Sequence, residues 1–366
     1  MSCKHFVRIV PSLFLSSLVM LSSCRKDETQ ELTEIESVNS PYTLSHEGFP
    51  APTIGNDNPL TIEGVKLGRY LFYDNRLSAN NNISCSSCHQ QSNAFSDVNA
   101  LSPGTDGLLG HRHAMATFNM AWNDNGLFWD GRADILRHQV LMPIEDPLEM
   151  NESLESVIAK LEGISFYPSQ FAKAFGTNEI NADRISLALE QFLFSIVSNR
   201  SKYDLWLQGE AELTAEEERG RFLFFTEYNP GFPSESGADC QHCHSGPNFS
   251  NNQYMNNGLD SDDFFVDFGR ELVTGIAPDR ANFKVTSLRN IELTPPYMHD
   301  GRFQSLEEAV NHYNLVTMSS TLEPEFEQQL PNGLQLSSDD KAALVSFLKT
   351  LTDIPLTQDN RYSNPF

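Results

Sequence analysis

The chain has 366 residues, of which 39% are hydrophobic and 20% charged, a balance that excludes wholesale disorder and suggests about two domains. Its 49 acidic residues outnumber its 25 basic ones, and the formal net charge of −24 disfavours nucleic-acid binding and suits a basic partner. No apolar run after Leu21 is long enough to span a bilayer.

The N-terminus is typical of an export signal. Lys4 and Arg8 precede an apolar run that ends at Leu21 and is too short and too interrupted for a membrane anchor. The next residues, Ser22-Ser23-Cys24, complete a pattern that resembles a bacterial lipobox, in which the cysteine is lipidated. We therefore predict a periplasmic protein anchored through a lipid on Cys24, with a plain signal peptide as the alternative.

Two copies of the motif C-x-x-C-H account for the four cysteines other than Cys3 and Cys24. They are Cys85-Ser86-Ser87-Cys88-His89 and Cys240-Gln241-His242-Cys243-His244. This motif is the attachment signature of c-type haem, because two thiols on one helical turn reach the porphyrin and the histidine ligates the iron. A zinc site and a redox dithiol are the alternatives, but each pair is far from the other and has its own histidine. We predict two covalently bound haem c groups.

The sequence around the two motifs repeats, which predicts two haem domains related by duplication. Gly68-Arg69-Tyr70-Leu71-Phe72 precedes the first motif, as Gly220-Arg221-Phe222-Leu223-Phe224 precedes the second. Asp130-Gly131-Arg132 and Asp300-Gly301-Arg302 follow them. Arg132 and Arg302 are candidates for binding haem propionates, and structural roles near helix ends are the alternative.

The two copies of the repeat differ at one position where a side chain could ligate the haem iron. Thirteen residues after the aspartate of the second Asp-Gly-Arg stands Tyr313, and thirteen after the first stands Pro143. Tyrosine can ligate iron and proline cannot, so we expect an open first iron and a second iron closed by Tyr313. Met298 and His299 are rival ligands, and a buried, hydrogen-bonded core tyrosine is the alternative for Tyr313.

Helical periodicity dominates the chain and strand signals are few. Apolar spacing predicts helices over 182–208 and 338–351, and capping boxes predict helix starts at Thr214 and Ser305. We expect a mainly α protein of two cytochrome-c-like haem domains, with the haems near the domain interface. The predicted segments are a signal peptide at 1–23, a tether at 24–58, an N-terminal domain with the reactive haem at 59–209 and a C-terminal electron-transfer domain at 210–352.

From about Leu60 to its end the chain resembles the bacterial diheme cytochrome c peroxidase family, which includes the diheme enzyme of methylamine utilisation. The motifs are Leu67 to Phe72, Ser84 to His89, Phe128 to Arg132, Pro147 to Met150 and Leu293 to Gly301. The resemblance implies that Glu149 is the acid/base group over the open iron and that Gln139 is its polar neighbour. It implies that Trp129 relays electrons between the haems, and that the tail at 353–366 packs on the N-terminal domain.

The same resemblance bears on the second iron and on a calcium ion. Tyr313 stands where the peroxidases have a methionine ligand and the methylamine enzyme has a tyrosine. Thr294 and the carbonyl group of Pro296 match family contacts to a calcium ion between the haems. The chain has His113 where the family often has a calcium-binding asparagine, and histidine is a poor ligand for a hard cation, so calcium is left open.

Three functions follow from these observations. The first is reduction of hydrogen peroxide with electrons from a small cytochrome c or cupredoxin. The second is oxidation of a protein side chain or small organic substrate through a His/Tyr-ligated haem. The third is electron transfer without catalysis, which needs both irons closed. A homodimer is compatible with all three, and we expect no nucleic-acid partner.

Overall fold

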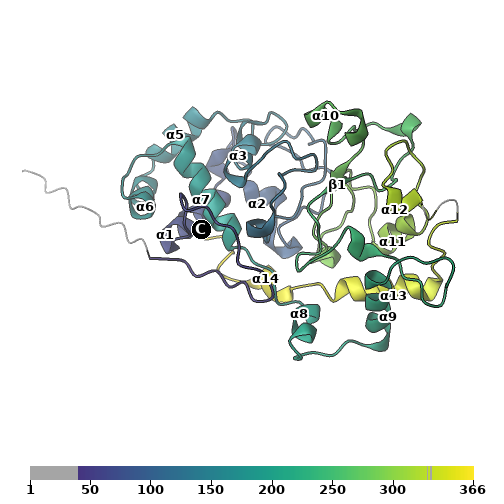
Figure 1. Ribbon diagram of the computed structural model, residues 1–366. Coiled ribbons are helices and arrows are strands. Elements are labelled where there is room, and N and C mark those ends of the chain that lie inside the picture. Colours follow the sequence, from purple (N-terminus) through teal and green to yellow (C-terminus); the bar gives the residue numbers. More distant parts are fainter. Residues whose placement is uncertain (1–39, 328, 330–331) are drawn as a thin grey trace, which may run out of the picture. The chain divides into compact units, whose positions relative to one another are not determined.

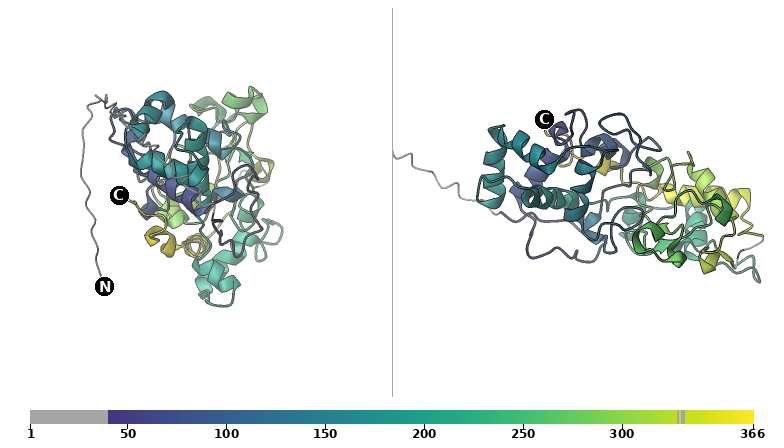
Figure 2. Two further views of the ribbon diagram at one scale, coloured as in Figure 1. Left: turned by 90° about the vertical axis from the view of Figure 1, so that its left-hand side faces the viewer. Right: turned by 90° about the horizontal axis from the view of Figure 1, so that it is seen from above.

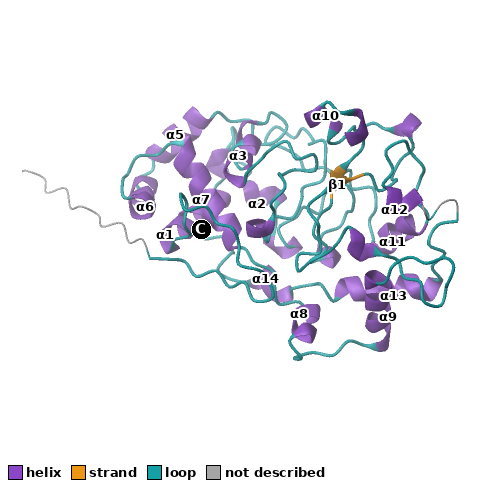
Figure 3. Ribbon diagram, viewed as in Figure 1, coloured by secondary structure: helices purple, strands orange, loops and turns teal. Residues whose placement is uncertain are grey.

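The computed structural model describes residues 40–327, 329 and 332–366, and most of its regular structure is helical (Figures 1 and 3). The predicted signal peptide, the lipidation site at Cys24 and the first part of the predicted tether lie outside the described residues. Within the described part, the strands are β1 (Tyr254–Met255) and β2 (Phe283–Lys284), which pair antiparallel. The prediction of a mainly α protein is confirmed. No described helix has the length and apolar character needed to cross a membrane.

The helices follow one another along the chain and can be divided into two series, each of which includes one C-x-x-C-H motif in its range. The first series is α1 (Ile62–Phe72), α2 (Cys85–Cys88), α3 (Leu136–Gln139), α4 (Met142–Glu145), α5 (Leu154–Glu162), α6 (Phe166–Phe175), α7 (Ala182–Ser195) and α8 (Lys202–Leu207). The second series is α9 (Ala215–Phe225), α10 (Glu271–Thr274), α11 (Leu306–Asn314), α12 (Pro324–Glu327), α13 (Ser338–Lys349) and α14 (Ile354–Gln358). We call residues 59–209 the first half and residues 210–352 the second half.

Each half is built on one close helix crossing, α1 against α7 and α9 against α13. A Cβ atom added at Gly68 would lie 1.9 Å from the carbonyl oxygen of Ala188. One added at Gly220 would lie 1.9 Å from the carbonyl oxygen of Ala343. Only glycine permits this approach of two backbones. The glycine of the repeated Gly-Arg motif therefore allows the same close helix packing in both halves.

The two Asp-Gly-Arg segments also share their local geometry. An antiparallel bridge from Leu127 to Ala133 closes the first turn, and one from Tyr297 to Phe303 closes the second. The central glycines of both turns have φ values of +74° and +68°, in the left-handed region that favours glycine. Sequence repetition is thus accompanied by repetition of backbone conformation.

The predicted helix over 182–208 is divided in the structure. Its first part, α7, ends at Ser195, and α8 begins only at Lys202. Between them, the backbone N–H groups of Asn199 and Arg200 donate to the Asp353 carboxylate at 3.0 and 3.1 Å. A tail carboxylate thus satisfies donors that a continuous helix would have bonded internally. The helix near 338–351 and the capping boxes that start α9 and α11 are confirmed.

Both ends of the described chain lie against the first half. After α14 the tail returns to α1, where the C label stands in Figures 1 and 2. There the Tyr362 hydroxyl donates to the Ser195 carbonyl at 2.8 Å, and Arg69 Nε donates to the Ser363 carbonyl at 2.6 Å. The described part of the predicted tether, residues 40–58, also packs on the body, since the Phe49 ring contacts Trp122 at 4.6 Å between centroids.

Candidate functional site

The first half encloses a cavity of about 730 Å³ with His89 in its wall. Cys85 and Cys88 begin and end α2, and both line the cavity as free thiols. Nδ1 of His89 lies 3.1 Å from the carbonyl oxygen of Phe95, which can only accept, so Nε2 is left to coordinate a metal. Burial lowers the pKa of His89 and keeps the imidazole neutral, as coordination requires.

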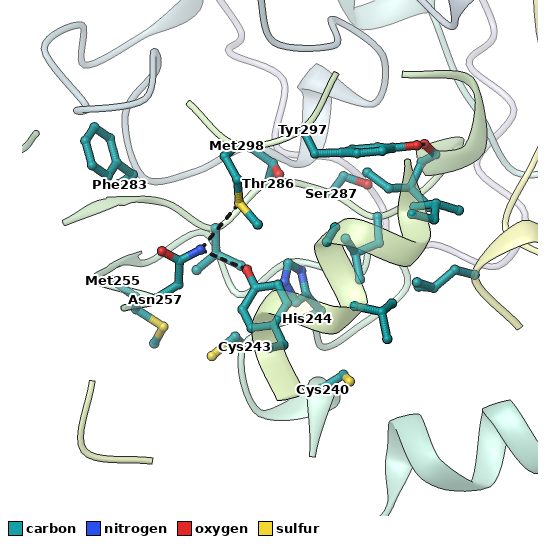
Figure 4. A pocket seen from close by; sticks show the side chains of 18 of the residues that line it. Cys240, Cys243, His244, Met255, Asn257, Phe283, Thr286, Ser287, Tyr297 and Met298 are labelled. Atoms are coloured by element: carbon teal, nitrogen blue, oxygen red, sulfur yellow. Dashed lines mark hydrogen bonds between the residues drawn. The ribbon is translucent and has the colours of Figure 1, made fainter. Parts of the chain in front are cut away.

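The second half repeats this arrangement around a cavity of about 250 Å³ (Figure 4). Cys240 and Cys243 line it as free thiols, and His244 Nδ1 lies 3.1 Å from the carbonyl oxygen of Phe249. Burial lowers the pKa of His244 to about 4. Phe95 and Phe249 both have positive φ, 61° and 51°, and this conformation turns each carbonyl back to its histidine. Each half thus presents two thiols and one oriented imidazole to one cavity.

Three residues that the sequence singled out also line the first cavity: Glu149, Gln139 and Pro143. Burial and, to a smaller extent, the nearby charge of Asp146 raise the pKa of Glu149 to about 7 against the opposing effect of Arg132. A carboxyl group that titrates near neutral pH, in the same cavity as a histidine, is suited to proton transfer. The side chain of Pro143 offers no atom that could ligate a metal.

The second cavity contains different candidate ligands. Tyr313 and Met298 both line it, and Figure 4 shows the Asn257 side chain beside Met298. Asn257 Nδ2 donates to the Tyr313 hydroxyl at 3.1 Å and to the Met298 sulfur at 3.5 Å. Burial raises the pKa of Tyr313 to about 12. His299, the third rival, lines the same cavity, but its ring stacks on Phe283 with centroids 3.7 Å apart.

Trp129 is shared by the two cavities and lines both of them. Its indole N–H donates to the carbonyl oxygen of His113 at 2.8 Å, and its ring meets His299 edge to face at 6.4 Å. The backbone N–H of His113 donates in turn to the carbonyl oxygen of His299 at 2.7 Å. The indole is therefore fixed where the two halves touch.

The two arginines of the Asp-Gly-Arg motifs are placed differently. Arg132 lines the first cavity, lies 3.5 Å above the Phe128 ring and pairs with Asp130 at 3.2 Å. Arg302 is exposed and pairs with Asp260 at 2.8 Å and Asp300 at 2.6 Å. It is not among the residues that line the second cavity. The structure brings only the first of these propionate candidates to a haem cavity.

The candidate calcium contacts, Thr294 and Pro296, both line the second cavity. Nδ1 of His113 lies 3.0 Å from the Asn99 carbonyl, and Nε2 lies 3.3 Å from the Ser96 hydroxyl, so both ring nitrogens already have partners. The described residues contain no cluster of three or more histidine, cysteine or acidic side chains that could hold a metal ion. Calcium binding by this chain stays a prediction.

Sequence reasoning missed several residues that shape the site. Asn257 carries no motif, and only the fold brings it to Tyr313. Lys284 lines the second cavity with its ammonium group 2.9 Å from the Asn125 carbonyl, and burial lowers its pKa to about 8. Arg112 joins the halves, since it pairs with Asp130 at 2.6 Å and Asp267 at 2.7 Å. One indication of a role for Arg112 was present in the sequence: it lies next to His113, in a segment where the chain departs from the family pattern.

Comparison with known proteins agrees with this geometry. The profile described as "Di-haem cytochrome c peroxidase" matches residues 62–212. The methylamine utilization protein MauG of Methylophilus methylotrophus is 32% identical over 83% of this chain and 86% of its own length. The cytochrome c551 peroxidase of Nitrosomonas europaea is 34% identical over 83% of this chain and 84% of its own. A crystal structure of a MauG-like protein associated with microbial copper homeostasis aligns with a TM-score of 0.77 and 34% identity, covering 88% of this chain and 98% of that one.

The chain belongs to the di-haem cytochrome c peroxidase family. Its relatives include peroxidases and MauG enzymes, and the family carries two c-type haems, so the chain is a haem-dependent oxidoreductase of one of these two kinds. The diheme peroxidase BthA of Burkholderia thailandensis, 23% identical with a TM-score of 0.68, shares the fold.

Proposed function

We propose that the protein is a periplasmic diheme peroxidase that reduces hydrogen peroxide to two molecules of water, using two electrons and two protons. The electrons come singly from a small cytochrome c or cupredoxin. The observation that carries the proposal is the first cavity, where a carboxyl group with a pKa of about 7 lines the same cavity as His89, Gln139 and Pro143.

The residues present fit two covalently held haems. In each half the thiols are free and line the cavity, and the histidine has one nitrogen held by a carbonyl and the other unengaged. Cys85, Cys88 and His89 would hold the first haem, and the equivalent triad would hold the second. Haem iron supplies a site that coordinates peroxide and exchanges electrons one at a time.

Glu149 is the group that moves the proton. As a carboxylate it accepts the proton from the nearer peroxide oxygen and delivers it to the farther one, which leaves as water. A pKa near neutral makes both the acceptance and the return of the proton favourable at physiological pH. Gln139 lines the same wall and is suited to orient the peroxide through its amide.

The second half is proposed to pass electrons rather than bind peroxide. Tyr313 and Met298 line the same cavity as His244, so this cavity offers heteroatom ligands besides the histidine. Trp129 lines both cavities and is the aromatic group best placed to carry electrons between them. The net charge of −24 favours a basic donor.

A second function has a specific observation in its favour. Tyr313, rather than a methionine, stands thirteen residues after the second Asp-Gly-Arg aspartate, and MauG proteins are among the relatives at 32–34% identity. A diheme oxidase of a protein side chain or small organic substrate is therefore the alternative. We further propose that Cys24 carries a lipid that holds the enzyme at the periplasmic face of a membrane.

One experiment separates these functions. Holoprotein matured in a periplasm is examined by electron paramagnetic resonance before and after addition of peroxide, and peroxide consumption is followed with a reduced small cytochrome c. We expect one high-spin and one low-spin iron and donor-dependent turnover. Two low-spin irons without turnover would make the protein an electron carrier. Peroxide consumption that requires an organic or protein substrate, and not the cytochrome, would favour the oxidase.

A further inference from the structure

The Asn257 side chain donates hydrogen bonds to two candidate ligands of the second cavity, Tyr313 and Met298. Its amide nitrogen carries two hydrogens, of which one is directed to the Tyr313 hydroxyl at 3.1 Å and the other to the Met298 sulfur at 3.5 Å. In Figure 4 two dashed lines start at the amide nitrogen of Asn257. One ends at the Met298 sulfur, and the other ends at a phenol oxygen. Both acceptors are thus held by one group.

The backbone at Asn257 is held by its neighbours. The main-chain carbonyl oxygen of Asn257 lies 3.0 Å from Nε2 of His312, the residue before Tyr313 on α11, and can only accept from it. The preceding Asn256 side chain donates to Ser319 at 3.0 Å and to Thr321 at 2.9 Å, both on the segment that follows α11. The backbone that carries the Asn257 side chain is therefore tied to α11 and to the segment after it.

The two acceptors differ in chemistry. A phenol or phenolate oxygen is a strong acceptor, and a charged oxygen forms the stronger bond, whereas a thioether sulfur is a weak one. The N–H directed to Tyr313 therefore contributes more than the N–H directed to Met298. This stronger hydrogen bond fixes the position of the Tyr313 hydroxyl oxygen. The weaker hydrogen bond to Met298 keeps the sulfur at a fixed distance from Tyr313.

The first cavity offers a comparison inside the same chain. Pro143 stands at the position equivalent to Tyr313, and Phe128 at the position equivalent to Met298, and both line the first cavity. Neither side chain can ligate iron or accept a hydrogen bond. An amide that selects between two possible iron ligands is needed only in the second cavity, which contains both Tyr313 and Met298.

We propose that Asn257 is a positioning residue that selects Tyr313 over Met298 as the side chain that closes the second haem iron. The inference deepens the proposed function and needs only that the second haem is bound through Cys240, Cys243 and His244. It assigns ligand choice to a hydrogen bond rather than to the presence of a tyrosine alone.

The test compares the holoprotein with Asn257→Leu, which has a similar size and no donor, and with the double variant Asn257→Leu/Met298→Leu. Gln253→Leu is the matched control, because it is the same exchange on an exposed amide that contacts only Asn251. Each protein is first shown to carry two covalent haems on a denaturing gel. The readouts are the ligand-specific absorption and magnetic circular dichroism bands, and the midpoint potential of the second haem.

We expect tyrosinate bands in the natural protein and in Gln253→Leu. Asn257→Leu should lose them, gain methionine-ligand bands and shift its potential positively, since methionine ligation raises haem potentials. The double variant should regain tyrosinate bands. Methionine bands in the natural protein, or bands and potential in Asn257→Leu equal to those of Gln253→Leu, would overturn the inference even where peroxide turnover supports the proposed function.

If Asn257→Leu fails to assemble, Asn257→Asp provides the same test. The carboxylate has the shape of the amide but cannot donate to Tyr313. It should therefore also lose the tyrosinate bands. Retention of the natural bands and potential by an Asn257→Asp protein that carries two haems would be equally damaging to the inference.

Discussion

The first and second cavities are built from the same parts and differ in what faces the histidine. In both, a positive-φ phenylalanine carbonyl fixes Nδ1 and two thiols line the wall. The first cavity is also lined by a titrating carboxyl group and a proline, whereas the second is lined by a tyrosine, a methionine and the amide that joins them. The two halves thus share the thiols and the oriented histidine, and we propose that the other lining residues decide whether a half does proton chemistry or electron transfer.

The proposed difference between the two cavities is tested most directly at Glu149. In Glu149→Gln the proton acceptor is lost, so peroxide turnover should fall by about 10²–10⁴-fold while both haems stay attached. Turnover is measured with reduced cytochrome c, and haem content is measured on a denaturing gel. Glu145→Gln, the same exchange at an exposed position of α4, is the control and should keep full activity. Near-normal turnover in Glu149→Gln would remove the carboxyl group from the mechanism.

The contact between the halves is the next point at which to test the comparison. Arg112 pairs with Asp130 of the first half and Asp267 of the second, and its side chain is only 12% exposed. Arg112→Leu leaves Asp267 without its ionic partner and leaves Asp130 with Arg132 alone, so the free energy of unfolding should fall by about 3–5 kcal/mol. Urea denaturation of the holoprotein measures this loss. A change below about 1 kcal/mol, the value expected of an exposed pair, would show that the halves do not depend on this pair.

The pH dependence of turnover should also come from the first cavity. The pKa of Glu149 is about 7, so activity should fall as pH drops through that value and the carboxylate becomes protonated. The nearby negative charge of Asp146 is one cause of the raised pKa. Asp146→Asn removes this charge. It keeps a side-chain oxygen that can accept from the Leu148 N–H, as Asp146 does at 2.8 Å. The inflection in the pH profile of turnover should therefore move to lower pH.

The turnover profile of each variant is measured across neutral pH with the same donor. Glu145→Gln again serves as the control and should leave the inflection where it is. An inflection that stays in place in Asp146→Asn, or that survives in Glu149→Gln, would assign the pH dependence to another group.

The sequence predicts the parts of this site that are coded by short motifs. C-x-x-C-H places the thiols and histidine on one turn, and capping boxes place the starts of α9 and α11. The break in the 182–208 helix could not be foreseen, because the carboxylate that accepts from the backbone N–H groups at the break comes from Asp353, far along the chain. Asn257 was missed for the same reason, since its contact with Tyr313 spans 56 residues and no periodicity records it.

The smallest effect concerns the two Asp-Gly-Arg motifs, whose sequences are identical and whose surroundings are not. Asp130 is buried and accepts from Arg112 of its own half, while its carbonyl accepts from Arg270 of the other. Arg302, by contrast, pairs with Asp260 and Asp300 at the surface, where such pairs contribute about 0–1 kcal/mol. Arg302→Gln should therefore change the free energy of unfolding by no more than that and leave both haems bound.

Urea denaturation and a haem count on the same sample measure this, with Arg132→Gln as the counterpart from the first half. Because Arg132 lines its cavity and Arg302 does not, only the first substitution should disturb a haem spectrum. Loss of the second haem from Arg302→Gln would mean that this arginine leaves its surface aspartates to bind a propionate when the haem is present. The second motif would then serve its cavity as the first does, and the difference between the halves would be confined to the wall that faces the histidine.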